Sequence, residues 1–415
     1  MDNLTHTLIG LAAGEAMARC TRARQGGLAD PARRTTLLAL GVIGGNLPDA
    51  DLLWSMQVFT GDSVDYLVDH RGHTHTLVAC VALAGLMLLA TLAILRWRGQ
   101  RFRAPDAGLL GAMALLAVML HLGMDALNEY GVHPFWPWDN RWYYGDAVFI
   151  VEPLFWLATA PLYFSLRTRV ARILLALVIT VGCIAVLAFH RFGVVWWTLP
   201  ALALLLLFAG RRLSPRAASL VAISLLSAVV GVFSAARAVV TRRVNVLAAE
   251  QFPGATTLDL VLSPAPAHPL CWEVMLLQRE GGTYLARMGQ LSLLQGKADA
   301  EAGGPCARSI GAEATAPLEA LQIPSRDGMR WASQFSMDAI ELAQLAASNC
   351  DTRRLASFLR VPFAAMTGEG WILGDLRFDR EPGVGFAETL IDPASPAKCA
   401  RSVPWAAPRG DLGFH

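Results

Sequence analysis

Long runs of apolar residues occupy the first 240 residues of the chain. A helix needs about 20 mostly apolar residues to cross a bilayer. Five runs approach or reach this length: Leu77–Leu95, Ala107–Met124, Ala171–Phe189, Val194–Gly210 and Ala217–Val240. Three more are shorter or are interrupted by Gly, Pro or acidic residues: Thr7–Ala18, Thr35–Leu53 and Phe149–Leu166. The pattern predicts a mainly α, polytopic membrane bundle of about eight helices, with a range of six to eight.

The composition agrees with a membrane protein. Hydrophobic residues make up 54% of the chain and charged residues only 16%, whereas soluble proteins contain about 25% charged residues. The N-terminus, MDNLTHTLIG, has an acidic residue and no basic region before its apolar run. We therefore expect internal segments, and not an ordinary cleavable signal peptide, to direct insertion.

Arginine is unevenly distributed between the loops. Fifteen arginines fall in alternate loops: Arg19, Arg22, Arg24, Arg33, Arg34, Arg96, Arg98, Arg101, Arg103, Arg167, Arg169, Arg172, Arg211, Arg212 and Arg216. The opposite loops contain only Arg71, Arg141 and Arg191. Because arginine-rich loops stay in the cytoplasm, we expect the N-terminus, segments 54–76 and 125–148, and everything after about residue 240 to lie outside. Three arginines at the exit of the last helix run against this trend: Arg237, Arg242 and Arg243.

The character of the chain changes after residue 240, where apolar runs shorten to the length of strands. We expect strands at Thr257–Leu262, Trp272–Gln278 and Thr283–Met288, and a helix near Ser336–Ser348. The predicted organisation is a membrane metal-site region at 1–160, additional membrane helices at 161–243, and an extracytoplasmic α+β domain at 244–415.

Four of the seven cysteines fall in this last domain: Cys271, Cys306, Cys350 and Cys399. In an oxidising compartment, four cysteines can form disulfides in any of three connectivities. Four unpaired thiols are the alternative.

Four short polar motifs carry the candidate chemistry, and all fall on the outer side of the predicted topology. They are DNLTHT at 2–7, NLPDAD at 46–51, HRGHTHT at 70–76 and HLGMD at 121–125. Imidazole and carboxylate groups are the usual ligands of catalytic zinc and also suit manganese or iron. His121 and Asp125 are four residues apart, so both project from one helical face and can hold one ion. Taken singly, such residues are more often helix caps or solvated side chains; four motifs together favour a shared metal site.

These four strings, in this order, resemble the YdjM-like family of bacterial inner-membrane proteins, described as membrane-bound, metal-dependent hydrolases. The resemblance covers roughly residues 1–160, including the stretch from Trp142 to Pro153. It implies a location in the bacterial inner membrane and a set of metal ligands: His6, Asp49, His70, His75, His121 and Asp125. His73 stands where the family pattern is free. A more distant likeness to zinc-dependent phospholipase C and the single-strand nucleases implies phosphoester chemistry.

The implied reaction is hydrolysis by a metal-activated water, because bound divalent ions lower the pKa of water and neutralise charge on phosphoryl oxygens. Asp49 or Asp51 would act as general base or hold the water. Arg71 would clamp a phosphate oxygen, or would instead pair with Asp69 or a lipid headgroup. Asp146 and Glu152 are either further ligands or acidic residues favoured at a helix N-terminus.

The aromatic residues of Phe135–Trp138 and Trp142–Tyr144 are typical of a membrane interface, so we expect an amphiphilic or lipid-like phosphoester substrate. Zincin, serine-hydrolase and P-loop motifs do not occur, nor does a basic patch for nucleic acid. Two other classes stay open: a transporter or metal-permeation protein, and a non-catalytic stress or assembly factor with a structural metal. Uptake of labelled metal into proteoliposomes would distinguish the first of them.

Overall fold

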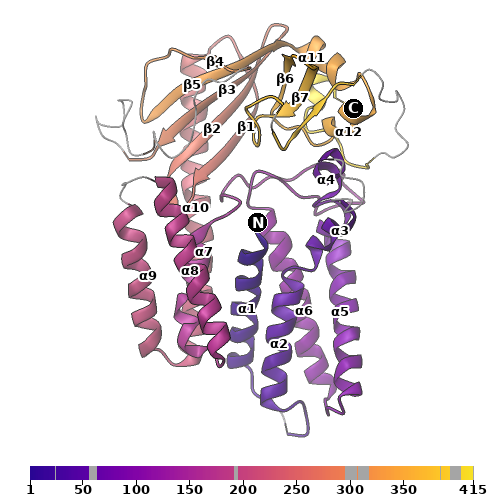
Figure 1. Ribbon diagram of the computed structural model, residues 1–415, viewed down its shortest axis with the longest axis vertical. Coiled ribbons are helices and arrows are strands. Elements are labelled where there is room, and N and C mark those ends of the chain that lie inside the picture. The colour runs from indigo at the N-terminus through magenta and orange to yellow at the C-terminus, as the bar shows by residue number, and fades with distance from the viewer. Residues whose placement is uncertain are drawn as a thin grey trace.

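The computed structural model describes residues 1–23, 25–55, 63–190, 195–294, 306, 317–383, 385–392 and 403–414. Two layers are stacked along the long axis of the molecule (Figure 1). Long, roughly parallel helices form one layer, and two β-sheets with short helices form the other. The N-terminus lies between the two layers.

Seven long helices occur among the described residues. They are α1 (Asn3–Cys20), α2 (Asp30–Gly44), α5 (Leu77–Trp97), α6 (Ala104–Asp125), α8 (Arg169–His190), α9 (Val195–Arg212) and α10 (Pro215–Gln251). Short elements occupy the outer connections and one break in the bundle: η1 (Pro48–Asp51), α3 (Leu52–Ser55), α4 (Ser63–Asp69), η2 (His73–His75), α7 (Pro153–Ala158) and η3 (Ala160–Ser165). A predominantly helical N-terminal region is therefore confirmed.

Three of these helices, α5, α6 and α10, are long and apolar enough to cross a membrane. The outward face of α5 supports this interpretation, because Val81, Leu86 and Leu89 are all more than half exposed. Apolar side chains on the outside of a long helix are stable in lipid but not in water. The structure thus confirms a membrane region with three candidate spans.

Two predicted helices are not continuous in the structure. The segment Phe149–Leu166 consists of the short helices α7 and η3, because Pro153 starts the first and Pro161 lies at the start of the second. Proline lacks the N–H group and favours the first turn of a helix over its interior. In the same way, α2 ends at Gly44, and Pro48 begins the 3₁₀ helix η1, so Thr35–Leu53 is not one helix.

Helices α1 and α2 are in direct backbone contact. A Cβ atom added to Gly10 would lie 2.0 Å from the carbonyl oxygen of Gly41, and one added to Gly14 would lie 2.7 Å from that of Leu37. Only glycine permits this approach, which resembles small-residue packing between membrane helices. The contact brings the outer ends of the two helices together, so Gly45 lies against the backbone of His6.

The C-terminal region contains a five-stranded sheet with the order β1-β2-β3-β5-β4. Its strands are β1 (Thr256–Ala265), β2 (His268–Glu280), β3 (Thr283–Ser292), β4 (Glu319–Ala320) and β5 (Met329–Asp338), and all neighbours are antiparallel. The three predicted strands are confirmed. Helix α10 continues to Gln251, so the predicted domain boundary at 244 lies inside this helix.

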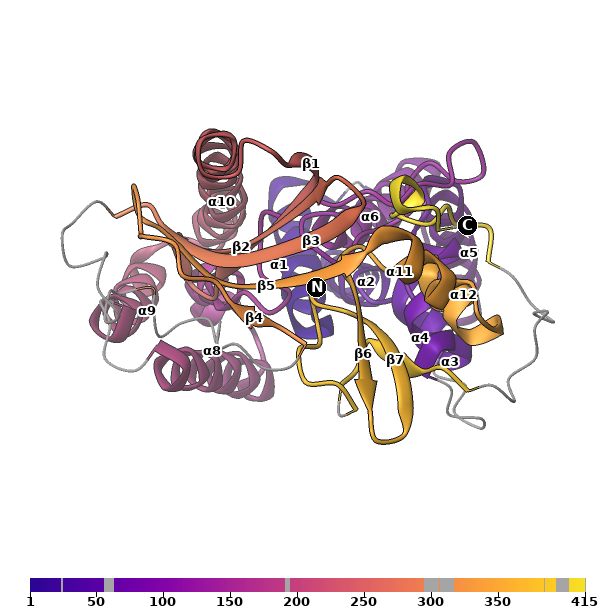
Figure 2. The same ribbon diagram turned by 90° about the horizontal axis from the view of Figure 1, so that it is seen from above.

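A second sheet has the order β6-β7-β8 and contains β6 (Pro362–Thr367), β7 (Gly370–Asp375) and β8 (Glu388–Leu390). The remaining elements are α11 (Ala339–Ala346), α12 (Cys350–Ala356) and the 3₁₀ helix η5 (Gly410–Leu412). The predicted helix near Ser336–Ser348 corresponds to α11, although its first residues belong to β5. Seen from above, α12 lies over α4, with which it is in contact (Figure 2). The two layers share one apolar core, in which Val64, Leu67 and Trp142 pack with residues of the C-terminal domain.

Three described cysteines of the C-terminal domain are disulfide-bonded. Cys271 and Cys306 form a disulfide, and Cys350 is also disulfide-bonded, while Cys399 lies outside the described residues. Cys20, Cys80 and Cys183 of the helical region are free thiols. The described disulfide-bonded cysteines thus lie in the layer of sheets, and the free cysteines lie in the helical layer.

Candidate metal centre

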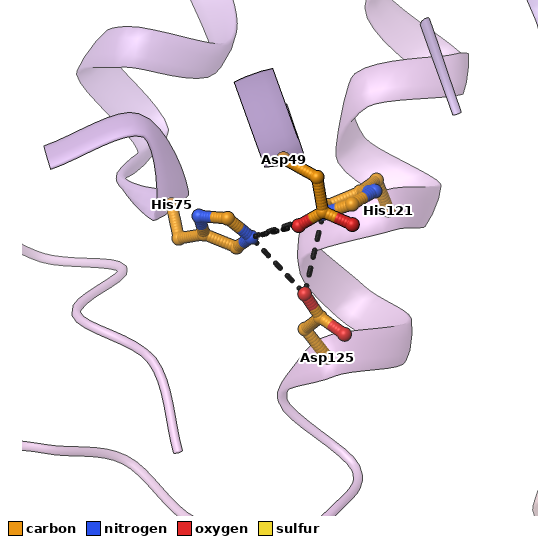
Figure 3. Close-up of side chains that lie close together, drawn as sticks. All are labelled: Asp49, His75, His121 and Asp125. Carbon is orange, nitrogen blue, oxygen red and sulfur yellow. Dashed lines mark hydrogen bonds and ion pairs between the residues drawn. The ribbon is translucent and has the colours of Figure 1, made fainter. Parts of the chain in front are cut away.

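Four side chains from three separate segments converge beside the last turn of α6 (Figure 3). Asp49 comes from η1, His75 from η2, and His121 and Asp125 from the last turns of α6. The four-residue spacing on α6 places His121 and Asp125 on one face, as the sequence predicts. The chain turns after α2 at Gly45 and begins η1 at Pro48. This turn places Asp49 beside His121 and Asp125.

The four side chains meet around a common point. His75 Nε2 lies 3.0 Å from His121 Nε2. Asp125 Oδ2 is 3.1 Å from His75 Nε2 and 3.2 Å from His121 Nε2. Asp49 Oδ1 is 3.3 Å from each of the same two nitrogens. All four residues are buried, and the most exposed of them, Asp49, is only 7% exposed.

Hydrogen bonds on the far side of each ring orient the two histidines. His121 Nδ1 is 2.8 Å from the carbonyl oxygen of Gly45 and donates to it. His75 Nδ1 is 3.0 Å from Thr74 Oγ1 and 3.5 Å from Asp51 Oδ2. A proton held on Nδ1 leaves the Nε2 lone pair directed at the centre. Metal-binding histidines are commonly oriented in this way by carboxylate and carbonyl groups.

The donor set fits a divalent cation. Asp49 Oδ1 is buried without a hydrogen-bond partner, and two imidazole Nε2 atoms face each other beside two carboxylates. A cation between them would satisfy all four ligand atoms, which lie within 4.8 Å of one another. Asp49, His75, His121 and Asp125 could therefore bind a metal ion. Two nitrogens and two oxygens suit zinc, and also manganese or iron.

Asp51 and His70 form a second group beside the first, sharing Asp49 with it. Asp51 Oδ1 is 3.0 Å from His70 Nδ1. Its Oδ2 accepts hydrogen bonds from the Arg71 backbone N–H and from Thr74 Oγ1, at 3.0 and 2.8 Å. These contacts of Asp51 fix the conformation of the segment that carries His70 and His75.

His6 contacts two members of the four-residue group, Asp125 and His121. Its Nε2 is 3.3 Å from Asp125 Oδ1, and its ring stacks on that of His121 with centroids 3.9 Å apart. The Met1 amino group contacts the same oxygen. Neither nitrogen of the His6 ring has a hydrogen-bond partner, although both are buried. The structure therefore brings all six implied ligands into one region, in which His6 contacts Asp125 and His121.

Arg71 is buried within this region and points into it. A guanidinium nitrogen is 3.1 Å from Asp125 Oδ1, another is 3.0 Å from Asn128 Oδ1, and the group lies over the Tyr130 ring. Its backbone has a φ of 61°, a left-handed conformation that is unfavourable for an arginine. Arg71 thus forms an ion pair with Asp125, a partner that is not among those expected from the sequence.

Asp49, Asp51 and His75 shift one another's pKa values against the effect of burial. Burial alone would raise the pKa of Asp49, but the imidazoles of His121 and His75, each 3.3 Å from its Oδ1, hold that pKa well below its usual range. Burial alone would lower the pKa of His75, but Asp125, Asp49 and Asp51 raise it to about 10. Burial would also raise the pKa of Asp51, but His70 and His75 hold that pKa below its usual range. Such a set of buried carboxylates attracts cations.

Asp146 and Glu152 lie apart from the cluster. Asp146 forms a two-pronged ion pair with Arg360 of the C-terminal domain. Glu152 caps α7 by accepting a hydrogen bond from the Leu154 N–H, and it also accepts one from Ala267. Between the two interpretations of Glu152, the structure thus supports the helix cap.

Two histidines that the motifs did not assign to the cluster have defined places beside it. His133 is fully buried, and its ring lies 3.9 Å from those of both Trp142 and Trp405. His73 packs on Trp136 and Trp405. Sequence reasoning missed Trp405 and Arg360, because nothing in their local sequence indicates a contact with residues more than 200 positions away.

The fold and this centre define an integral membrane protein with a buried Asp/His cluster of metal-binding type. Residues 1–194 match the family model described as YdjM inner membrane protein, so this region is similar to the YdjM-like family that its motifs predict. The protein YfhP of Bacillus subtilis (strain 168), described as uncharacterized, is 27% identical over 142 residues. That match covers 34% of this chain and only 39% of the relative. No solved structure matches the chain.

Proposed function

We propose that this protein is a membrane-bound, metal-dependent hydrolase that cleaves a phosphoester in an amphiphilic or lipid-like substrate. The observation that carries this proposal is the buried group of Asp49, His75, His121 and Asp125, with its ligand atoms within 4.8 Å of one another. Structural zinc sites are closed and often rich in cysteine, whereas catalytic sites use histidine and carboxylate ligands. None of the three free cysteines belongs to this group.

A divalent ion held in such a site lowers the pKa of water and neutralises charge that develops on phosphoryl oxygens. The residues of the chain supply the remaining functions. Asp49, whose Oδ1 faces both imidazole Nε2 atoms at 3.3 Å, would hold the attacking water or accept its proton. Asp51 supports His70 and His75. Arg71 places a guanidinium group beside Asp125, where it can stabilise negative charge in the substrate.

An amphiphilic substrate is supported by the position of the centre. It lies where α6 ends and α5 begins, beside a loop with the exposed aromatic residues Phe135 and Trp138. The carbonyl oxygen of Pro134 accepts a hydrogen bond from Leu77, which joins this loop to the first turn of α5. Trp138 is 79% exposed, as expected of an anchor in the headgroup layer. Trp142, by contrast, donates to the Ser357 carbonyl and belongs to the interface with the C-terminal domain.

We further infer a multi-pass topology in the bacterial inner membrane, with α1, α2, α8 and α9 completing the bundle of α5, α6 and α10. This number of helices falls within the predicted range of six to eight. The arginine-rich connections lie at the end of the bundle opposite the sheets (Figure 1). Disulfides form in oxidising compartments, so the bond between Cys271 and Cys306 favours an extracytoplasmic C-terminal domain and metal centre.

Labelling of cysteines from outside the cell tests this orientation. Cys20 is exposed near the arginine-rich end of α1, and Glu369 is exposed in the turn between β6 and β7. In spheroplasts, a membrane-impermeant maleimide should label a Glu369→Cys variant at once. It should label Cys20 only after permeabilisation, with Cys80 and Cys183 replaced by alanine. The reverse pattern would place the centre in the cytoplasm.

Metal analysis combined with a panel of phosphoesters tests the activity. The purified wild type should contain stoichiometric divalent metal. His75→Ala and Asp125→Ala should each lose the metal and reduce hydrolysis on the order of 100-fold or more, because the ion supplies several kcal/mol of transition-state stabilisation. His73→Ala is the matched control, since this histidine of the same motif faces Trp136 and Trp405. Absence of metal from the wild type would refute the proposal; metal without cleavage of any ester would favour a structural metal.

A further inference from the structure

Two segments of the membrane region bring residues to the metal centre without extensive regular structure of their own. Residues 70–76 include Arg71 in a left-handed conformation and only one 3₁₀ turn, η2. Residues 126–148 follow Asp125 and contain Asn128, the partner of Arg71. Contacts from outside the first segment therefore contribute to the position of His70, Arg71 and His75. Both segments lie directly beneath the C-terminal domain (Figure 1).

Trp405 packs directly on the first of these segments. A Cβ atom added to Gly72 would lie 2.7 Å from the Trp405 ring, so the indole rests on the backbone of the HRGHTHT motif. The indole N–H donates to the carbonyl oxygen of Val68 at 2.8 Å. Its ring also stacks on His133 at an interplanar angle of 24°. His133 Nδ1 in turn lies 3.3 Å from the carbonyl oxygen of Arg71, which links Trp405 to the strained residue.

Arg360 and Arg377 hold the second segment. Arg360 binds both oxygens of Asp146 at 2.7 and 2.8 Å, and its guanidinium lies 4.0 Å from the centre of the Tyr144 ring. Arg377 donates to the carbonyl oxygen of Glu129 at 2.7 Å. Both arginines are buried. The loop that leaves Asp125 is therefore held from above by two charged side chains.

We propose that the C-terminal domain is part of the metal centre, and that Trp405 is a positioning residue for the segment carrying His70, Arg71 and His75. This inference rests on metal binding at the proposed site. It assigns a function to a region beyond the 194 residues that match the family. Loss of a residue that orients a metal ligand commonly lowers metal affinity 10- to 100-fold. The affinity for zinc should therefore depend on Trp405, although its side chain touches none of the implied ligands.

Two matched tryptophan variants separate positioning from general stability. Trp405 and Trp331 are both buried residues of the C-terminal domain, with 6% and 3% exposure, and both donate an indole hydrogen bond of 2.8 Å. Trp331 donates to Gln251 and packs on Phe252, at the end of α10 and away from the cluster. Its loss should destabilise the fold without reaching the ligands.

The experiment measures the Kd for Zn²⁺ by competition with a chelator, together with the unfolding temperature, in full-length purified protein. Trp405→Ala should weaken zinc binding about 10-fold or more. Trp405→Phe, which keeps a ring over Gly72, should recover much of the loss. Trp331→Ala should lower the unfolding temperature and keep the wild-type Kd.

Each outcome is decisive. Wild-type zinc affinity in folded Trp405→Ala, or an equal loss in Trp331→Ala, would overturn this inference and leave the proposed function intact. If Trp405→Ala does not fold, Trp405→Leu takes its place, because leucine fills part of the space but has no ring to stack on His133 and no N–H group for Val68. A wild-type Kd in folded Trp405→Leu overturns the inference, and weaker binding with an unchanged unfolding temperature supports it. A wild type that binds no zinc or other divalent metal would overturn the proposed function and this inference with it.

Discussion

Replacing Arg360 with methionine is expected to lower the free energy of unfolding by about 3–5 kcal/mol, the usual loss when one partner of a buried ion pair is removed. Arg360 is 4% exposed and lies between Asp146 of the membrane region and Asp259 of β1. Methionine keeps the apolar length of the side chain but leaves the 2% exposed Asp146 carboxylate without this cation. The loss should be measured by urea-dependent proteolysis of the C-terminal domain.

An exposed pair in the neighbouring loop provides the control. Arg141 binds Asp139 at 2.7 Å, but its side chain is 72% exposed, so water and salt screen the interaction. Arg141→Met should leave the urea midpoint unchanged. If Arg360→Met behaves in the same way, the ion pair with Asp146 does not hold the two layers together.

Replacing Asp51 with asparagine is expected to weaken zinc binding by about 10- to 100-fold while the protein stays folded. Asparagine has the same shape and keeps one acceptor oxygen. It lacks the negative charge that faces His75 Nδ1 and His70 Nδ1, so both rings become poorer electron donors and lose a fixed orientation. Zinc affinity should be determined by competition with a chelator at constant pH.

Asp69→Asn is the control, because Asp69 is a buried carboxylate of the same segment that belongs to neither candidate metal group. It should change the Kd for zinc less than about twofold. Unchanged zinc binding in Asp51→Asn would show that Asp51 does not orient the histidines. Complete loss, as expected for Asp125→Ala, would show that Asp51 is itself a ligand.

Apolar length predicted the long helices well, because a helix in lipid satisfies its backbone groups internally and needs a minimum span. The predicted ends of α5 and α6 differ from the observed ones by at most three residues. Prolines were the main source of error: Pro153, Pro161 and Pro48 divide segments that are apolar enough to be counted as helices. Their effect depends on the position within the helix, which apolar length does not measure.

The motifs predicted the metal centre more completely than its surroundings. His121 and Asp125 lie on one helical turn, so their geometry follows from spacing alone. The position of His6 beside Asp125 and His121 follows instead from the packing of α1 on α2 through Gly10 and Gly41. The contact between Trp405 and Val68 joins residues 337 positions apart, and no local pattern encodes such a distance. For the same reason, the pairing of Asp146 with Arg360 could not be foreseen.

Helix α10 continues without interruption from the membrane layer to Gln251, and β1 begins at Thr256. Because α10 is continuous, the number of residues in it determines how the sheet is rotated relative to the membrane helices. One residue inserted into α10 would turn everything beyond it by about 100° and raise it by about 1.5 Å. Trp405 and Arg360 would then miss their partners. The number of residues in α10 is therefore constrained, because it sets the orientation of the C-terminal domain over the metal centre.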